Sequence, residues 1–251
     1  MNPFDLSGRC AIVTGANTGI GQAIAVGLAN AGADIIGVGR SPMVETADLV
    51  TTAGRAFHPL LADLSRMDEV RAVIADACAI RQSPDILVNN AGIIRRADTI
   101  DFTEEDWDAV MDTNLKSAFF LCQAFARVAM AQKLPAKIIN IASLLSFQGG
   151  IRVASYTAAK SGLAGLTRLM ANEWAVHGIN VNAIAPGYVE TNNTTALRAD
   201  AERNADILKR IPARRWARAD DMAGAAVFLA SHASDYVHGT VLPVDGGWLA
   251  R

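Results

Sequence analysis

The chain has 251 residues, of which 51% are hydrophobic and 19% charged, and its formal net charge is −2. A chain of this length and composition can bury one large core, which excludes an intrinsically disordered protein. The small net charge provides no electrostatic reason to expect nucleic acid as a partner. The apolar runs are shorter than a membrane span and the first nine residues contain no signal-peptide core, so we expect a cytoplasmic protein without a membrane segment.

The cysteines and histidines are scattered along the chain. None of them form pairs at the spacing that metal ligands usually have, so we predict no metal site. The cysteines lie in apolar or helical stretches, which indicates reduced structural thiols rather than disulfides. They are Cys10, Cys78 and Cys122.

Short runs rich in β-branched residues alternate with longer segments of helical periodicity. The runs predict strands at 10–13, 34–38, 56–60, 86–89, 137–141, 179–184 and 240–244. Helices are predicted near 19–31, 66–81, 104–133, 155–177 and 219–231, with a weaker one after Pro42. This alternation predicts an α/β fold, a Rossmann-type doubly wound parallel sheet of about seven strands with helices on both faces. No linker or repeat divides the sequence, so we expect residues 1–251 to form a single domain.

The segment 188–218 has the weakest pattern of the chain. It contains a polar run at 192–195 and then a cationic group, Arg210, Arg214, Arg215 and Arg218. A long polar insertion within a compact domain is usually functional. We therefore expect residues 188–218 to form a lid over an active site.

The first predicted strand ends in a glycine-rich turn, TGANTGIG at 14–21. Its three glycines allow a tight turn and the close approach of a ligand to the backbone. The helix that follows offers free amide groups and the positive end of its dipole to a pyrophosphate. Such turns also occur as plain loops and helix caps, but the position between a first strand and a helix favours dinucleotide binding.

Further motifs follow this turn in a definite order. They are Asn89-Asn90-Ala91-Gly92, Asn114, Ser143, Tyr156-x-x-x-Lys160, Pro186-Gly187 and Val244-Asp245-Gly246-Gly247. Together with the TGxxxGxG spacing of the turn, they resemble the short-chain dehydrogenase/reductase family over almost the whole chain. The resemblance implies an NAD(P)-dependent oxidoreductase that acts on CH–OH groups.

The resemblance also implies which residues bind the dinucleotide. Asp63 would hydrogen-bond the adenine, although from the sequence it could equally be the N-cap of the next helix. Asn90 and its two small neighbours would line the ribose and pyrophosphate, and the segment after the sixth strand would hold the nicotinamide. The full set is Gly15, Asn17, Thr18, Gly19, Ile20, Arg40, Ser41, Asp63, Leu64, Asn90, Ala91, Gly92, Tyr156, Lys160, Pro186, Gly187, Val189 and Thr191.

The end of the second predicted strand bears on the choice of cofactor. An acidic residue there binds the ribose 2′-hydroxyl of NAD, whereas an arginine accommodates the 2′-phosphate of NADP. The sequence has Gly39 in the place of the acid, followed by Arg40 and Ser41. This favours NADP, with Ser41 as a second phosphate donor. NAD stays open as the alternative, because the 15–21 turn contains none of the basic residues that many NADP-preferring relatives have there.

Tyr156 and Lys160 are four residues apart in a predicted helix, so their side chains share one face. A nearby ammonium favours the phenolate and lowers the phenol pKa from its ordinary value of about 10, which suits Tyr156 to acid–base chemistry. Ser143 ends the fifth predicted strand, where its hydroxyl can bind a carbonyl or alkoxide oxygen. The resemblance implies that Asn114 kinks its helix and holds a water linked to Lys160. A lone Tyr-x-x-x-Lys is more often a surface pair, but with the other motifs present we predict these four as catalytic residues.

The segments 91–96, 107–115 and 146–150 resemble one branch of the family, the 2-deoxy-D-gluconate 3-dehydrogenases, also called 2-dehydro-3-deoxy-D-gluconate 5-dehydrogenases. That resemblance implies a substrate that is a hydroxy or keto sugar acid. The Gly39-Arg40 pair departs from the branch, which commonly uses NAD.

A sugar-acid carboxylate needs a cation, for which the forked guanidinium group of arginine is well suited. Arg95 and Arg152 are the best placed, Gln148 could bind a sugar hydroxyl, and Ser143 belongs to the same site. The alternative for Arg95, Arg96 and Arg152 is loop charge that faces solvent or another subunit.

Two other functions stay open. A 3-oxoacyl-carrier-protein reductase would share the catalytic motifs and could use the arginines of 210–218 to dock its acidic carrier protein. A dinucleotide-binding regulator without catalysis is disfavoured, because it would not need Ser143, Tyr156 and Lys160. The resemblance further implies a homotetramer in which helices 104–133 and 155–177 pair between subunits.

Overall fold

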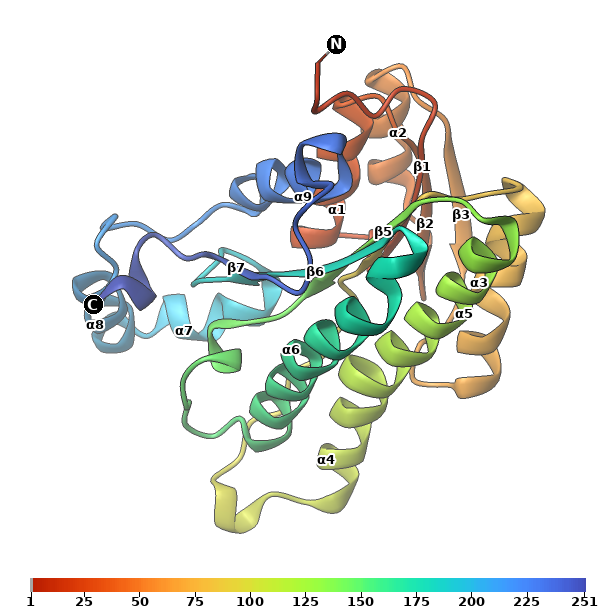
Figure 1. The fold of residues 1–251 in the computed structure, drawn as a ribbon. Helices are drawn as coiled ribbons and strands as arrows, with labels where there is room; N and C mark the ends of the chain where they lie inside the picture. Colours follow the sequence, from red (N-terminus) through yellow and green to blue (C-terminus); the bar gives the residue numbers. More distant parts are fainter. Residues whose placement is uncertain (1) are drawn as a thin grey trace.

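The computed structural model describes residues 2–251, which form a seven-stranded parallel sheet with the order β3-β2-β1-β4-β5-β6-β7 (Figure 1). The strands are β1 (Cys10–Thr14), β2 (Asp34–Gly39), β3 (Phe57–Leu61), β4 (Ile86–Asn89), β5 (Ala136–Ile141), β6 (Ile179–Pro186) and β7 (Val241–Val244). Each lies within two residues of its predicted bounds. The predicted doubly wound sheet is therefore confirmed.

Helices cover both faces of the sheet (Figure 1). One face carries α1 (Gly19–Asn30), α2 (Val44–Thr52) and α9 (Ala223–Ala230). The other carries α3 (Met67–Ile80), α5 (Ser117–Gln132) and α6 (Ala154–Trp174), with α4 (Glu104–Met111) packed against α6.

Two apolar cores follow from the alternation of side chains along the strands. Ile12 and Ile36 point to the core beneath α3, α5 and α6, whereas Val13 and Ile35 point to the core beneath α1 and α9. All four side chains are completely buried. Strands that are buried on both sides need continuous apolar runs, which is why the sequence of the central strands shows no polar face.

The helix predicted over 104–133 is interrupted. A π-helical turn at Asp112–Lys116 separates α4 from α5, and Asn114 lies in this turn. Among residues 2–251, no helix is both long enough and apolar enough to cross a membrane.

The weakly patterned segment 188–218 contains two helices that the sequence did not predict, α7 (Thr195–Ala199) and α8 (Ala201–Arg210). The Asp200 carboxylate accepts a hydrogen bond from the Arg203 amide and so caps α8 (3.0 Å). Ile207 is the buried residue of this short and otherwise polar helix, so few apolar residues mark it in the sequence. In Figure 1 the segment extends beyond the ends of β6 and β7, and the chain terminus lies beside α8.

Candidate active site

The predicted site residues come together at the carboxyl edge of the sheet. The strand order reverses between β1 and β4, which is the point at which open α/β sheets bind their ligands. Loops that follow β1, β4, β5 and β6 bring residues more than a hundred positions apart to this edge. A Cβ atom added at Gly19, for example, would lie 3.5 Å from Cγ2 of Thr191.

The glycine turn after β1 needs glycine at several positions for separate reasons. Gly15 and Gly19 have φ angles of +66° and +59°, in the left-handed region that favours glycine. Gly21 lies so close to the turn that a Cβ atom would be 2.1 Å from the carbonyl oxygen of Gly15. Thr18 precedes α1 as its N-cap residue, and within the described chain its side chain makes no capping hydrogen bond. The first amides of α1 therefore remain available to an anionic group.

Asn90 and Thr14 join the ends of β1 and β4. The Asn90 amide group donates to the carbonyl oxygens of Thr14 (2.9 Å) and Gly15 (3.2 Å). The Thr14 hydroxyl oxygen accepts from the backbone amides of Asn90 and Ala91 (both 3.0 Å). The Asn90 side chain thus supports the glycine turn, in addition to the ribose contact that the family resemblance implies.

Asp63 and Leu64, predicted on the adenine side, have different environments. The Asp63 carboxylate accepts from the amide (3.0 Å) and hydroxyl (2.8 Å) of Ser65, and these hydrogen bonds lower the pKa of Asp63. The N-cap of α3 is Arg66, so the alternative that Asp63 caps this helix is wrong, because Asp63 closes a turn three residues earlier. Leu64 packs into the core at 5% exposure, which leaves only its backbone accessible to a ligand.

The segment after β6 is shaped by close packing against β7. The Gly187 amide donates to Val244 (3.0 Å), and a Cβ atom at Gly187 would lie 2.6 Å from Cα of Asp245. Pro186 and Val189 are buried, and Thr191 forms a reciprocal cap with Thr194. The backbone of 186–191 is therefore well defined beside the glycine turn.

Tyr156, Ser143 and Lys160 lie together. The Ser143 side chain lies close enough to Tyr156 to lower the phenol pKa, and its hydroxyl oxygen accepts from the Leu145 amide (3.2 Å). The Lys160 ammonium lies 5.6 Å from the centre of the Tyr156 ring and donates to the Ile141 carbonyl oxygen (2.6 Å). A hydroxyl, a phenol and an ammonium group thus lie at the end of β5 and on the first turns of α6.

The pKa values differ in direction from the sequence expectation. Burial raises the pKa of the Tyr156 phenol, and it outweighs the lowering effects of the Ser143 hydrogen bond and the Arg96 charge. Burial also lowers the pKa of Lys160 to about 8, so its ammonium form is itself disfavoured. The net shift of the Tyr156 pKa is therefore upward, whereas the spacing to Lys160 predicted a lowering.

Asn114 binds the loop that follows β4 rather than the other polar groups. Its Oδ1 accepts from the Ile93 amide and its Nδ2 donates to the Ile93 carbonyl (both 2.8 Å). A Cβ atom at Gly92 would lie 3.2 Å from Asn114 Oδ1, so the contact requires a small residue there. Asn114 therefore holds residues 92–93 in place through its side chain.

The residues predicted to bind substrate are mostly engaged elsewhere. Arg95 pairs with Asp106 and Arg152 pairs with Asp98, each at 3.1 Å. Gln148 Oε1 accepts from the indole of Trp248 (3.0 Å) and from Arg210 (3.3 Å).

Arg96 is the cation that the sequence reasoning did not select. It lies close enough to Tyr156 to lower the phenol pKa, and it donates to the Asn193 carbonyl oxygen (3.0 Å). Arg96 therefore connects the loop after β4 to the 188–218 segment next to the phenol. The sequence shows only that Arg96 follows Arg95 directly. The fold distinguishes the two, because it pairs Arg95 with Asp106 and directs Arg96 to Asn193.

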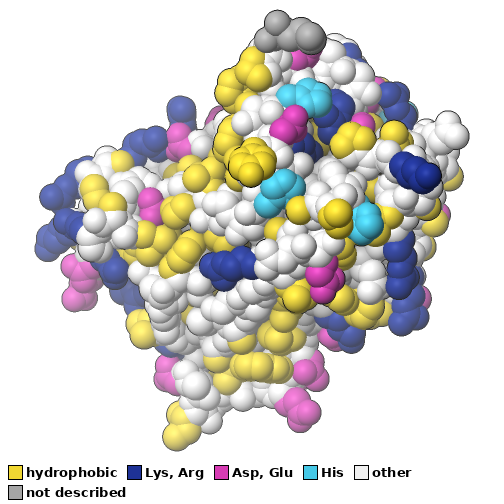
Figure 2. All heavy atoms as spheres, viewed as in Figure 1, with side chains coloured by type: hydrophobic (Ala, Val, Ile, Leu, Met, Phe, Trp, Pro, Cys, Tyr) yellow, Lys and Arg dark blue, Asp and Glu magenta, His cyan; other side chains and the backbone are white. Residues whose placement is uncertain are grey.

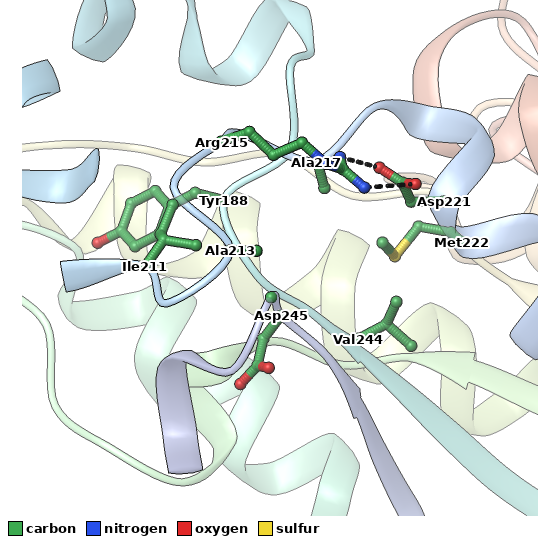
Figure 3. A pocket seen from close by; sticks show the side chains of 10 residues that line it. Tyr188, Ile211, Ala213, Arg215, Ala217, Asp221, Met222, Val244 and Asp245 are labelled. Carbon is green, nitrogen blue, oxygen red and sulfur yellow. Dashed lines mark hydrogen bonds and ion pairs between the residues drawn. The ribbon is translucent and has the colours of Figure 1, made fainter. Parts of the chain in front are cut away.

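A cavity of about 180 Å³ lies at the base of the 188–218 segment (Figure 3). It is lined by Tyr188, Ile211, Ala213, Arg215, Ala217, Asp221, Met222, Val244, Asp245 and Gly246, and by none of the predicted catalytic residues. Figure 3 shows the Arg215 guanidinium paired with Asp221 (2.6 and 3.0 Å), while the Asp245 carboxyl group points away from that pair. The Asp245 oxygens accept from the amides of Gly247 and Leu249 (both 2.9 Å).

The glycine turn lies where the strand order reverses, and the Ser–Tyr–Lys group lies at the same edge of the sheet. This combination defines a dinucleotide-dependent oxidoreductase. A family model described as enoyl-(acyl carrier protein) reductase matches residues 15–249. The 2-dehydro-3-deoxy-D-gluconate 5-dehydrogenase of Escherichia coli is 59% identical over 251 residues, which are 100% of this chain and 99% of that protein. The chain thus belongs to the short-chain dehydrogenase/reductase family, NAD(P)-dependent enzymes that act on CH–OH groups.

Solved structures agree with this assignment. An Agrobacterium tumefaciens protein crystallised with NADP is 62% identical, and each chain is covered to 100% with a TM-score of 0.96. A gluconate 5-dehydrogenase from Burkholderia cenocepacia, solved with NADP and tartrate, is 42% identical with a TM-score of 0.94. It covers 100% of this chain and 98% of its own.

Proposed function

We propose that the protein uses NADP to interconvert a hydroxyl and a keto group on a sugar acid of the 2-deoxy-D-gluconate or 2-keto-3-deoxygluconate type. The observation that carries the substrate class is that Arg96, a forked cation, donates to the Asn193 carbonyl oxygen (3.0 Å) and lies close enough to Tyr156 for its charge to lower the phenol pKa. The 59% identity to a 2-dehydro-3-deoxy-D-gluconate 5-dehydrogenase and the relatives solved with NADP support the same choice.

The residues at the sheet edge fit a dinucleotide. The glycine turn and the open amides of α1 suit the pyrophosphate, and Thr191 lies opposite the turn on the nicotinamide side. Arg40 is exposed and its charge lowers the Asp63 pKa, so a cation is available beside the adenosine end. The cofactor, when bound, supplies or accepts the hydride.

The protein's own groups move the proton and hold the substrate. Tyr156 transfers a proton at its phenolic oxygen to or from the substrate oxygen, and Ser143 donates a hydrogen bond to that same oxygen. Lys160, with a pKa of about 8, can take up and release a proton near neutral pH beneath the ring. Arg96 binds the substrate carboxylate and so fixes which carbon faces the phenol.

The experiment that tests this function is a substrate panel measured with NADP and NAD in parallel. We expect turnover of 2-keto-3-deoxygluconate-type and 5-keto sugar acids, with NADP preferred. Arg96→Ala should raise KM for the acids by about tenfold or more, because a charged hydrogen bond is lost. Arg71→Ala, which removes an exposed arginine of α3, is the control and should leave KM unchanged. Turnover of acyl thioesters alone would contradict the proposal.

To act as a 3-oxoacyl-carrier-protein reductase, the alternative function, the protein would need a free basic surface for the acidic carrier protein. Figure 2 shows Lys and Arg side chains gathered at the end of the molecule where Figure 1 places α8. Several of them already have partners within the chain: Arg210 stacks on Trp248 at 4.0 Å, Arg214 donates to Lys209 (3.2 Å), and Arg215 pairs with Asp221. These contacts favour a structural role for the arginines over carrier-protein docking.

We further infer that residues 188–218 act as a lid on a single domain and that the enzyme is a homotetramer. An apolar groove beside α5 and α6, lined by Met111, Leu115, Phe119, Phe120 and Leu166, supports pairing with a second copy. Gly165 on α6 is exposed, and a Cβ atom there would meet no other atom of residues 2–251 within 4 Å. Light scattering tests the assembly, and a monomer would refute it. The cytoplasmic location stays a prediction.

A further inference from the structure

The end of β2 is in contact with the glycine turn through one side chain. The Asn17 amide nitrogen donates to the Ser41 carbonyl oxygen (2.7 Å) and to the Ser41 hydroxyl oxygen (2.9 Å). These two hydrogen bonds join the turn after β1 to the loop after β2. They fix the orientation of the Asn17 side chain at the place where the adenosine ribose is expected.

Gly39 is required by this arrangement for a reason of space. A Cβ atom at Gly39 would lie 2.0 Å from Oδ1, 2.9 Å from Cγ and 3.1 Å from Nδ2 of Asn17. Gly39 has no positive φ angle, so its backbone conformation alone would accept other residues. Any side chain at position 39 must therefore displace the end of the Asn17 side chain, which donates both hydrogen bonds to Ser41.

Position 39 is also where an acidic residue would bind the 2′-hydroxyl of NAD. The Asn17 amide occupies the space that such an acid would need. At the same time the Ser41 oxygen accepts from Asn17, which leaves the hydroxyl hydrogen of Ser41 free to donate elsewhere. A phosphate oxygen is an acceptor, and the exposed Arg40 between Gly39 and Ser41 supplies the positive charge.

We propose that Asn17 is a specificity-determining residue, which excludes an acidic side chain at position 39 and orients the Ser41 hydroxyl toward the 2′-phosphate of NADP. Residues 17, 39 and 41 then select the cofactor as one unit. The proposal rests on the NADP preference in the proposed function. It makes the further claim that an acid at position 39 can bind NAD only when the Asn17 amide is removed.

The test measures binding by isothermal titration calorimetry, without substrate or turnover. The probes are adenosine 2′,5′-bisphosphate, which carries the 2′-phosphate, and 5′-AMP, which carries the free 2′-hydroxyl. Asn17→Ala and Ser41→Ala should each weaken the bisphosphate by about fivefold to tenfold and change 5′-AMP by less than about twofold. The two substitutions combined should weaken the bisphosphate by less than the product of the single effects, because they remove one shared arrangement.

The second part of the test introduces an acid at position 39. Gly39→Asp alone should weaken the bisphosphate without improving 5′-AMP, whereas Asn17→Ala with Gly39→Asp should bind 5′-AMP several-fold more tightly than wild type. Thermal unfolding shows that each variant is folded, and Arg40→Ala serves as a control that weakens the bisphosphate independently of Asn17. Equal gains in 5′-AMP binding with and without Asn17 would overturn the proposal. A wild type that binds both probes equally would overturn the NADP preference and this inference with it, whereas failure of the sugar-acid function would leave both results unchanged.

Discussion

The cofactor edge, formed by the ends of β1 and β4, and the substrate side, formed by the 188–218 segment, are held together in different ways. The ends of β1 and β4 are joined through backbone groups, since Asn90 and Thr14 bind main-chain atoms and glycines allow close contact. The 188–218 segment is held mainly by side chains, through a small buried cluster that includes Ile211 and Trp248 and through polar contacts such as that of Arg96 with Asn193. The C-terminal Arg251 also donates to the carbonyl oxygens of Lys209 and Arg210 at the end of α8.

The difference has a physical consequence. Backbone-held geometry depends on the allowed conformations of a short motif and changes little when surface residues change. A segment held by a small side-chain cluster and a few polar contacts opens at a lower free-energy cost than the main core, and single substitutions alter it. We therefore expect cofactor binding to be insensitive to changes in the 188–218 segment, and substrate turnover to be sensitive to both regions.

Tyr156 lies where the two regions meet and gives the largest expected effect. Tyr156→Phe keeps the ring and removes the hydroxyl that transfers the proton, so kcat should fall by about 10²–10⁴-fold. The Kd for NADP and the Tm should stay close to wild type, because the phenol ring remains packed. Stopped-flow turnover and calorimetric binding measure the two quantities. A kcat near wild type would contradict the assignment of Tyr156.

Gly21 tests whether the cofactor edge depends on close backbone contact. Gly21→Ala places a Cβ atom against the Gly15 carbonyl, so the free energy of unfolding should fall by about 1–3 kcal/mol and NADP binding should weaken. Gly224→Ala in α9 is the control, because a Cβ atom there meets no atom of the described residues within 4 Å. That variant should be equally stable or about 0.5–1 kcal/mol more stable. Urea unfolding measures the free energy of unfolding of both variants. Equal losses in Gly21→Ala and Gly224→Ala would argue against a tight turn.

Trp248 tests the side chains that hold the 188–218 segment and gives the smallest expected effect. Trp248→Phe removes the donor to Gln148 but keeps a ring beneath Arg210, so about 1 kcal/mol of local stability is lost. Amide hydrogen exchange in 195–210 should become several-fold faster, with no change in the Kd for NADP. Trp107→Phe, in the exposed part of α4, is the control and should leave that exchange unchanged. A change in NADP affinity without faster exchange would show that the two regions are not separable.

Several features of the fold and site could be predicted from the sequence because they depend on neighbours along the chain. The alternation of apolar runs predicts the seven strands, and the four-residue spacing of Tyr156 and Lys160 predicts that they share a helix face. Helix α8 was missed because it is short and polar, with Ile207 as its buried residue, so few apolar residues mark it in the sequence.

Tertiary structure alone decided which groups meet from distant parts of the chain. It pairs Arg95 with Asp106 and leaves its neighbour Arg96 beside Tyr156, and it binds Gln148 to Trp248, a hundred residues away. It also raises the Tyr156 pKa, because burial in the folded protein outweighs the lowering effects of Ser143 and Arg96. Spacing determines which side chains share an element, whereas burial and long-range contacts arise only when the elements pack, and at this site they decide the chemistry.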